Sequence, residues 1–144
     1  MKIDINGVSI TLTPEQLAEI ARQTNQLKSF RDITSFEKAC ERLGLDIPQF
    51  NSELTKGEIA LRKLKIIVRA IRSFTNWKPV WSNSKKWKYA AWFDLEKGFS
   101  YWSTNAYFTY AYVPSALFVE SSEQAEFLGK THLDLYKDYI FDGE

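Results

Sequence analysis

The spacing of the apolar residues changes after Phe74, and this change restricts the fold of the chain more than any other feature. Between Thr55 and Phe74, apolar side chains recur at intervals of three and four residues, as on one face of a helix. From Trp77 onward, polar and apolar side chains alternate in short runs, as in strands. A chain that holds separate helical and strand regions in this order is predicted to be an α+β protein.

Three helices are predicted in the first half of the chain, behind an N-terminal β-hairpin. Alternating residues flank Asn6-Gly7, and this dipeptide is a strong signal for a two-residue hairpin turn. Each helix begins at a capping sequence, in which a hydroxyl side chain is followed three residues later by Glu or Gln; the caps are Thr13, Thr34 and Thr55. The predicted helices span residues 13–26, 34–44 and 55–74.

The second half is predicted to form an antiparallel, aromatic-rich meander of four strands, followed by a C-terminal helix. The expected strands are residues 87–93, 99–104, 107–112 and 116–119. A chain of 144 residues can bury one sizeable core, so we expect a single domain over residues 1–144. Its parts are the hairpin with two helices (1–54), a long basic amphipathic helix (55–76), the strands (77–120) and the C-terminal helix (121–142).

Charge is segregated along the chain, although the net charge is only +1. Residues 55–93 carry ten basic side chains and one acidic, a net charge of +9, whereas residues 1–54 carry −2 and residues 94–144 carry −6. Fifteen of the 22 aromatic residues, including all five Trp, lie between Phe74 and Phe118. Such a combination is typical of polyanion binding, because cations neutralise phosphates and exposed rings stack on bases.

Several classes of protein are excluded by composition. The single Cys40 cannot form an internal disulfide or a multi-cysteine metal site, and it fits a reducing compartment. The N-terminus lacks the apolar run of a signal peptide, and no segment reaches the roughly 20 apolar residues of a membrane span. We therefore expect a soluble, cytoplasmic protein that does not associate with membranes and uses no cofactor.

Residues 74–140 carry a set of recognisable motifs: Trp77-Lys78-Pro79-Val80-Trp81, the run from Lys88 to Phe99, and residues 118–126 with Gly129. In these motifs the chain resembles a family of small proteins encoded by phages and prophages of gut Bacteroidetes; the opening hairpin and residues 13–16 resemble it more weakly. The resemblance implies a phage context, and hence the cytoplasm of a host cell. The family brings no established activity and no functional residue.

No pattern in the sequence indicates catalysis. Phosphate-binding glycine loops, zinc-protease motifs and nucleophile elbows are absent. The only histidine, His132, lies on an apolar helix face, which favours a packed core side chain over a general base, and Cys40 is expected to be a buried, inert thiol. Asp94 and Glu96 are interpreted as solvated turn residues. We therefore expect a protein that binds rather than an enzyme, with a carboxylate-only hydrolase as the exception that leaves no motif.

The basic stripe of the long helix and the segment that follows it form the predicted ligand site. Its expected ligand bears phosphate, as a single-stranded nucleic acid or a nucleotide does. The competing interpretation is an ordinary solvated helix face, whose Lys and Arg stems cover apolar edges. The candidate residues are Arg62, Lys65, Arg69, Arg72, Trp77, Trp81, Lys85, Lys86, Trp87 and Lys88.

A second hypothesis assigns the function to the rings of the sheet. Exposed Trp and Tyr side chains anchor protein interfaces, so the protein would be a virion or assembly component or an inhibitor of a host defence system. In the competing interpretation, cross-strand ring pairs only stabilise the sheet, and the sequence leaves open which face is exposed. The candidate interface residues are Trp102, Tyr107, Tyr110 and Tyr112.

Overall fold

The computed structural model describes residues 2–5, 8–17, 19, 27–83, 85–96, 98–107 and 115–142. β1 (Lys2–Ile5) and β2 (Val8–Thr11) pair antiparallel in the register expected of the predicted hairpin. Residues 14–17 are helical, and their start is capped reciprocally: the Gln16 amide donates to Thr13 Oγ1 at 3.2 Å, and the Thr13 amide donates to Gln16 Oε1 at 3.0 Å. Residues 20–26, which the prediction also made helical, lie outside the described residues.

The long basic helix is confirmed as α3 (Lys56–Arg72), although it ends two residues before Phe74. Thr55 is its N-cap and Glu58 completes the predicted capping box. One face of α3 is fully buried and forms the centre of the core, with Leu64, Ile67, Val68 and Ile71. The alternation of buried and exposed positions follows from the helical period of its apolar residues.

A second predicted helix is present as α2 (Phe36–Leu43), behind the short 3₁₀ helix η1 (Phe30–Asp32). It ends at the predicted Gly44, whose φ of +65° suits a residue without a Cβ atom. Its N-cap is Ser35 and not the predicted Thr34, since Ser35 Oγ accepts the Lys38 amide at 3.2 Å.

The predicted four-stranded meander is wrong, because the described residues of the second half hold one sheet of two antiparallel strands, β3 (Lys88–Asp94) and β4 (Ser100–Tyr107). β4 continues through Asn105 and Ala106, where the prediction placed a turn. That dipeptide lacks the glycine that would allow the positive φ angles of a tight hairpin. The predicted strand 107–112 begins at the last residue of β4, and residues 108–112 lie outside the described part of the chain.

The fourth predicted strand, residues 116–119, is a turn of 3₁₀ helix, η2 (Ser115–Leu117), and a single bridge between Val119 and Tyr89. A short apolar run predicts burial, but it does not distinguish a strand from a buried turn. β4 also carries a bulge: Trp92 pairs with Ser103 and Phe93 with Tyr101, so the intervening Trp102 has no partner across the ladder.

The predicted single C-terminal helix is two helices, α4 (Ser122–Thr131) and α5 (Leu133–Ile140), which meet at His132. The break allows α4 to pack on the β3–β4 sheet while α5 packs on α3. Gly129 is where α4 and the sheet approach most closely, because a Cβ atom there would lie 2.5 Å from Tyr101 Cδ2 and 2.8 Å from Ala91 Cβ. Burial of helix faces against two different partners therefore outweighs the continuity of one helix.

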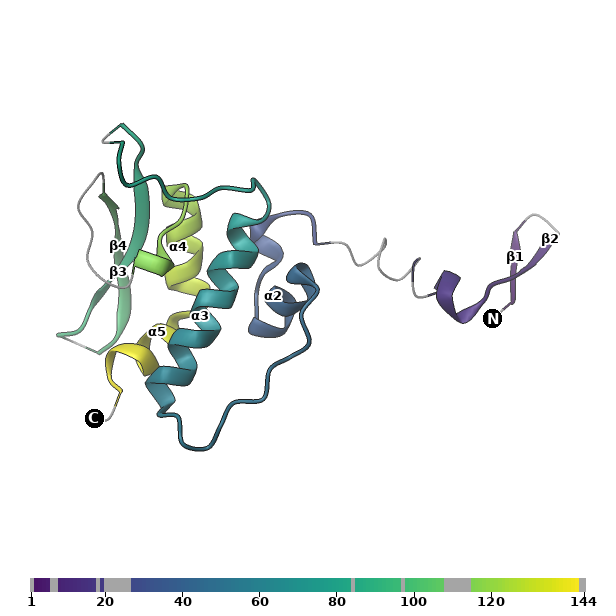
Figure 1. The fold of residues 1–144 in the computed structure, drawn as a ribbon, viewed down its shortest axis with the longest axis horizontal. Coiled ribbons are helices and arrows are strands. Elements are labelled where there is room, and N and C mark those ends of the chain that lie inside the picture. The colour runs from purple at the N-terminus through teal and green to yellow at the C-terminus, as the bar shows by residue number, and fades with distance from the viewer. Residues whose placement is uncertain are drawn as a thin grey trace.

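Figure 1 shows the resulting arrangement, with α3 in the middle, α2 on one side of it and the β3–β4 sheet with α4 and α5 on the other. The C-terminal end of the described chain returns to the start of α3: Asp142 accepts hydrogen bonds from the Thr55 hydroxyl at 2.6 Å and from the Gly57 amide at 3.0 Å. The predicted α+β class holds for the described residues, with fewer strands and one more helix than expected.

Candidate functional site

Three cations of the predicted stripe lie exposed on α3: Arg62, Lys65 and Arg69. Within the described part of the chain none of them forms an ion pair or a side-chain hydrogen bond. Seven helical residues separate the first from the last, which corresponds to about 10 Å along the axis. These three residues, which we term the basic row, therefore present unneutralised positive charge to solvent.

Arg72, the fourth residue of the predicted stripe, is half-buried and has a structural role. Its Nε donates to the Phe118 carbonyl oxygen at 2.8 Å, and its Nη2 donates to the carbonyl oxygens of Phe118 and Ala116, the latter at 3.2 Å. Burial lowers the pKa of the guanidinium, which nevertheless stays charged at neutral pH. Arg72 thus ties the end of α3 to η2 and has little capacity left for a ligand.

A cleft of ≈ 250 Å³ lies where α3 ends, and we call it the basic cleft. Asn76, with a φ of +54°, turns the chain there, and the Trp77 ring lies against Arg72, whose Cζ is 5.3 Å from the ring centroid. Asparagine tolerates this left-handed conformation better than most residues. The cleft is lined by Leu43, Arg69, Arg72, Ser73, Asn76, Trp77 and Lys78.

The segment between the cleft and β3 divides into an exposed part and a buried part. Lys85, Lys86 and Trp87 are exposed beyond a turn in which the Lys86 amide donates to the Asn83 carbonyl at 3.1 Å. Trp81 and Lys88 instead belong to the interior: Lys88 is 0% exposed and its Nζ lies 4.7 Å from the centroid of the Trp81 ring. These last two candidates therefore stabilise the fold rather than face a ligand.

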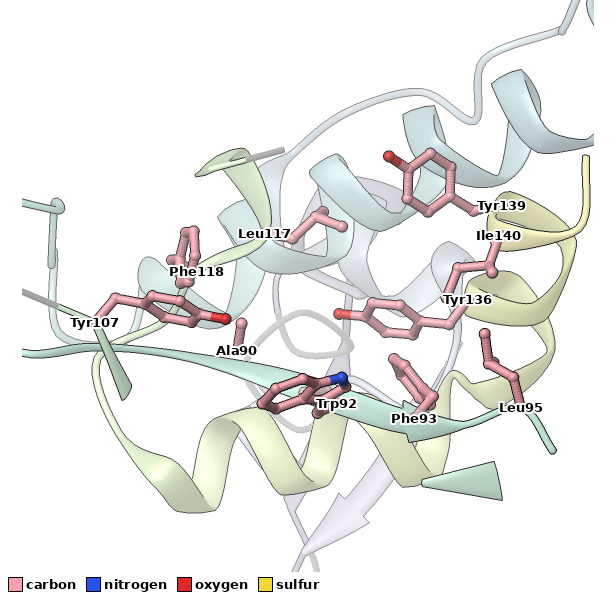
Figure 2. Close-up of a pocket in the computed structure, with 11 residues that line it drawn as sticks. Ala90, Trp92, Phe93, Leu95, Tyr107, Leu117, Phe118, Tyr136, Tyr139 and Ile140 are labelled. Atoms are coloured by element: carbon pink, nitrogen blue, oxygen red, sulfur yellow. The ribbon is translucent and has the colours of Figure 1, made fainter. Parts of the chain in front are cut away.

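A second cavity, of ≈ 240 Å³, lies between β3, η2 and α5, and we call it the aromatic cavity. Figure 2 shows its walls, with Ala90 and Trp92 from β3, Phe118 from the turn after η2, and Tyr136 from α5. Every residue that lines it is apolar or a tyrosine. Its interior therefore favours an uncharged occupant.

Two tyrosine hydroxyls point toward one another across the aromatic cavity, above Ala90 (Figure 2). Tyr107 accepts a hydrogen bond from Asn105 Nδ2 at 3.3 Å, and its ring packs edge-on against Phe118 with centroids 4.8 Å apart. Tyr136 is only 5% exposed, and burial raises the pKa of its phenol far above the ordinary value of 10.0. Both hydroxyls are neutral at physiological pH.

The predicted interface residues are distributed over three situations. Trp102 is 65% exposed at the bulge and packs edge-on against Trp92, with centroids 5.7 Å apart. Tyr107 is half-buried in the aromatic cavity, and Tyr110 and Tyr112 lie outside the described residues. Trp92, which is 47% exposed and borders the cavity, was missed as a candidate because strand alternation alone does not show which side of a sheet is covered.

The catalytic candidates that the sequence discounted are buried. His132 Nε2 lies 2.9 Å from the Ile33 carbonyl oxygen, and Cys40 lies in the core, where burial raises the pKa of the thiol. Both placements confirm the predicted packing. Among the described residues no three or more His, Cys, Asp or Glu side chains gather in a way that would hold a metal ion.

No protein-family model matches this chain, and the comparisons with curated proteins and with solved structures found no match. None of the helices in the described ranges combines the length and the apolar character needed to cross a membrane. The geometry of the basic cleft, the basic row and the aromatic cavity is therefore the basis for a functional assignment.

Proposed function

We propose that the protein acts by binding, as a phage accessory protein, and that it binds a phosphate-bearing ligand such as a single-stranded nucleic acid or a nucleotide. The observation that carries this proposal is the basic cleft, in which Arg69, Lys78 and the ring of Trp77 meet. A phosphate group lies between the two cations, and a base stacks on the ring.

The basic row extends the site along α3. Arg62 and Lys65 continue from Arg69 on the same exposed face, so a strand held in the cleft meets further cations as it leaves. No carboxylate occurs in the sequence between Glu58 and Asp94, which leaves this charge without internal competition. The site therefore suits a chain of several phosphates better than a single one.

The position of the cleft at the end of a helix has an electrostatic cost. The last carbonyl groups of a helix carry about half a negative charge, which repels an anion. Here the Ser73 and Trp77 amides satisfy the carbonyl oxygens of Arg69 and Arg72 at 3.0 and 3.2 Å, and Arg69 and Lys78 each contribute a full positive charge. The sum favours the anion, and recognition depends on the side-chain cations.

The proposal is tested by titrating a fluorescein-labelled oligothymidylate at low salt into the full chain and into the double variant Lys65→Gln/Arg69→Gln. We expect the double variant to bind about tenfold more weakly or worse, because two phosphate contacts are lost. Lys38→Gln/Lys137→Gln is the control, since it removes the same charge from exposed positions of α2 and α5. Absence of binding, or equal weakening by both double variants, contradicts the proposal.

A second candidate function, a protein-interaction module, is favoured by Trp102. A tryptophan that is 65% exposed, supported edge-on by Trp92, is the kind of side chain that anchors interfaces. Such a partner would belong to a virion, an assembly intermediate or a host defence system. Trp102→Ser separates the two candidates in the same titration: it leaves oligothymidylate binding unchanged if the basic cleft is the functional site.

A further inference from the structure

We infer that the aromatic cavity is a second binding site, which takes a small neutral aromatic group that carries one hydroxyl or N–H group. This inference uses none of the residues of the basic cleft and does not depend on the phosphate proposal. It rests on three properties of the cavity: its size, the chemistry of its walls and one buried hydroxyl without a hydrogen-bond partner.

The size fits one ring or two fused rings. A dry, apolar cavity of about 150 Å³ is enough to hold benzene, whereas sites for drug-sized ligands begin at about 300 Å³. The aromatic cavity, at ≈ 240 Å³, lies between these limits. Trp92 at its border leaves a flat entry, because that ring is 47% exposed.

The walls select against charge. Trp92, Phe118 and Ile140 supply apolar surface from three different segments, and no carboxylate, ammonium or guanidinium group lines the cavity. A charged ligand would lose its hydration without compensation, whereas a neutral ring would gain contacts on both faces.

The Tyr136 hydroxyl supplies the polar requirement. Its side chain is 5% exposed, yet the hydroxyl makes no hydrogen bond with any residue of the described part of the chain. The oxygen is not sealed in, because every fully enclosed side-chain nitrogen or oxygen among the described residues has a partner; it faces the cavity, opposite Tyr107 (Figure 2). A buried polar group that points into an apolar cavity is satisfied when an occupant brings a donor or an acceptor.

The occupant is therefore phenol-like or indole-like, and such a group comes either from a free small molecule or from the side chain of a bound peptide. The shared chemistry is tested with para-cresol, and toluene serves as the matched probe without the hydroxyl. N-acetyl-tyrosinamide distinguishes the two sources, because it carries the same ring with a peptide attached. Binding is followed by chemical shifts of the full-length protein, with Trp92 as a reporter at the border.

We expect para-cresol to bind with a dissociation constant on the order of 1 mM and toluene to bind about two- to tenfold more weakly, since one hydrogen bond is at stake. Tyr136→Phe keeps the ring and removes the hydroxyl, so it should reduce para-cresol affinity to that of toluene and leave toluene affinity unchanged. Tyr139→Phe is the control: that residue also lines the cavity, but its hydroxyl points away from it (Figure 2), and para-cresol affinity should not change.

The outcomes separate clearly. If N-acetyl-tyrosinamide binds as tightly as para-cresol, the cavity accepts a peptide side chain; if it is excluded while para-cresol binds, the occupant is a free small molecule. Failure of both para-cresol and toluene to bind overturns the site, and equal affinities of the two probes for the unmodified protein overturn the role of the hydroxyl. That last comparison needs no variant, so the inference stays testable even if Tyr136→Phe does not fold.

Discussion

The imidazole of His132 is enclosed in the core, with Nε2 facing the carbonyl oxygen of Ile33 at 2.9 Å. A carbonyl oxygen only accepts, so Nε2 carries the proton in the neutral ring. Burial disfavours the charged form and lowers the pKa from the ordinary 6.5, and the Ile33 hydrogen bond offsets only part of that effect. The folded protein therefore holds a neutral histidine at a pH where the unfolded chain is protonated.

This difference predicts a loss of stability on acidification. As the pH falls below 6.5 toward the lowered pKa of the folded state, the unfolded chain binds a proton that the folded chain does not, so the free energy of unfolding decreases. The slope is at most about 1.4 kcal/mol per pH unit, and the contribution is constant above pH 6.5. Urea unfolding between about pH 5 and 8 measures it.

His132→Gln is the comparison for that experiment, because glutamine retains an N–H donor and does not titrate. The difference in unfolding free energy between the two proteins should be constant above pH 6.5 and shrink below it, as the wild type loses stability. Parallel curves over the whole range would show that burial of His132 does not shift its titration.

At the scale of the element, α2 shows how far sequence signals reach. Both Thr34 and Ser35 are acceptable N-caps, and Glu37 three residues after Thr34 favoured the wrong one. The structure assigns Thr34 to the end of the preceding η1 turn, where its amide donates to the Asp32 carbonyl at 2.9 Å. Ser35 is then the first residue free to cap α2.

The two hydroxyls give a paired prediction. Ser35→Ala removes the acceptor of the Lys38 amide and should lower the free energy of unfolding by about 1 kcal/mol. Thr34→Ala removes no cap and should change it by less than about 0.5 kcal/mol, as expected for an exposed site. Chemical denaturation of both variants ranks them, and a larger effect at Thr34 would restore the cap that the sequence pattern indicates.

Helices were easier to predict than strands, and the reason is physical. The caps at Thr55 and Gly44 act within a few residues, so they are visible in the sequence. The run 116–119 and the end of β4 depend on pairing with distant residues, such as Val119 with Tyr89. Strand formation is decided by such partners, and one chain segment does not name its own.

At the scale of the whole molecule, the segregation of charge was visible in the sequence, whereas the aromatic cavity was not. The basic row lies on one helix, and its spacing alone places Arg62, Lys65 and Arg69 together. The cavity combines β3, η2 and α5, so its rings become neighbours only in the folded chain. Arg72, Trp81 and Lys88 show the converse, because tertiary packing removes them from the surface that their sequence neighbours share.

The charge pattern predicts how binding responds to salt. Each phosphate contact with a single strand contributes about 0.7 to the slope of log affinity against log salt concentration. Lys65→Gln/Arg69→Gln should therefore reduce that slope by about 1.4, while Lys38→Gln/Lys137→Gln leaves it unchanged. The oligothymidylate titration repeated at several salt concentrations measures the slope, and an unchanged slope in the first variant would place the phosphates elsewhere on the protein.

The central position of α3 also sets the order in which this protein can fold during synthesis. Its last residue, Arg72, is made about 70 residues before Asp142, which reaches back to its first turn. At 5–20 residues per second, the ribosome takes roughly 4–14 s to add them. For that time α2 is the only described helix yet made that packs on α3, and the side that later meets α5 and η2 has no cover. The nascent chain therefore offers a chaperone an apolar helix face for several seconds, and variants that slow the docking of α5 should aggregate before they lose equilibrium stability.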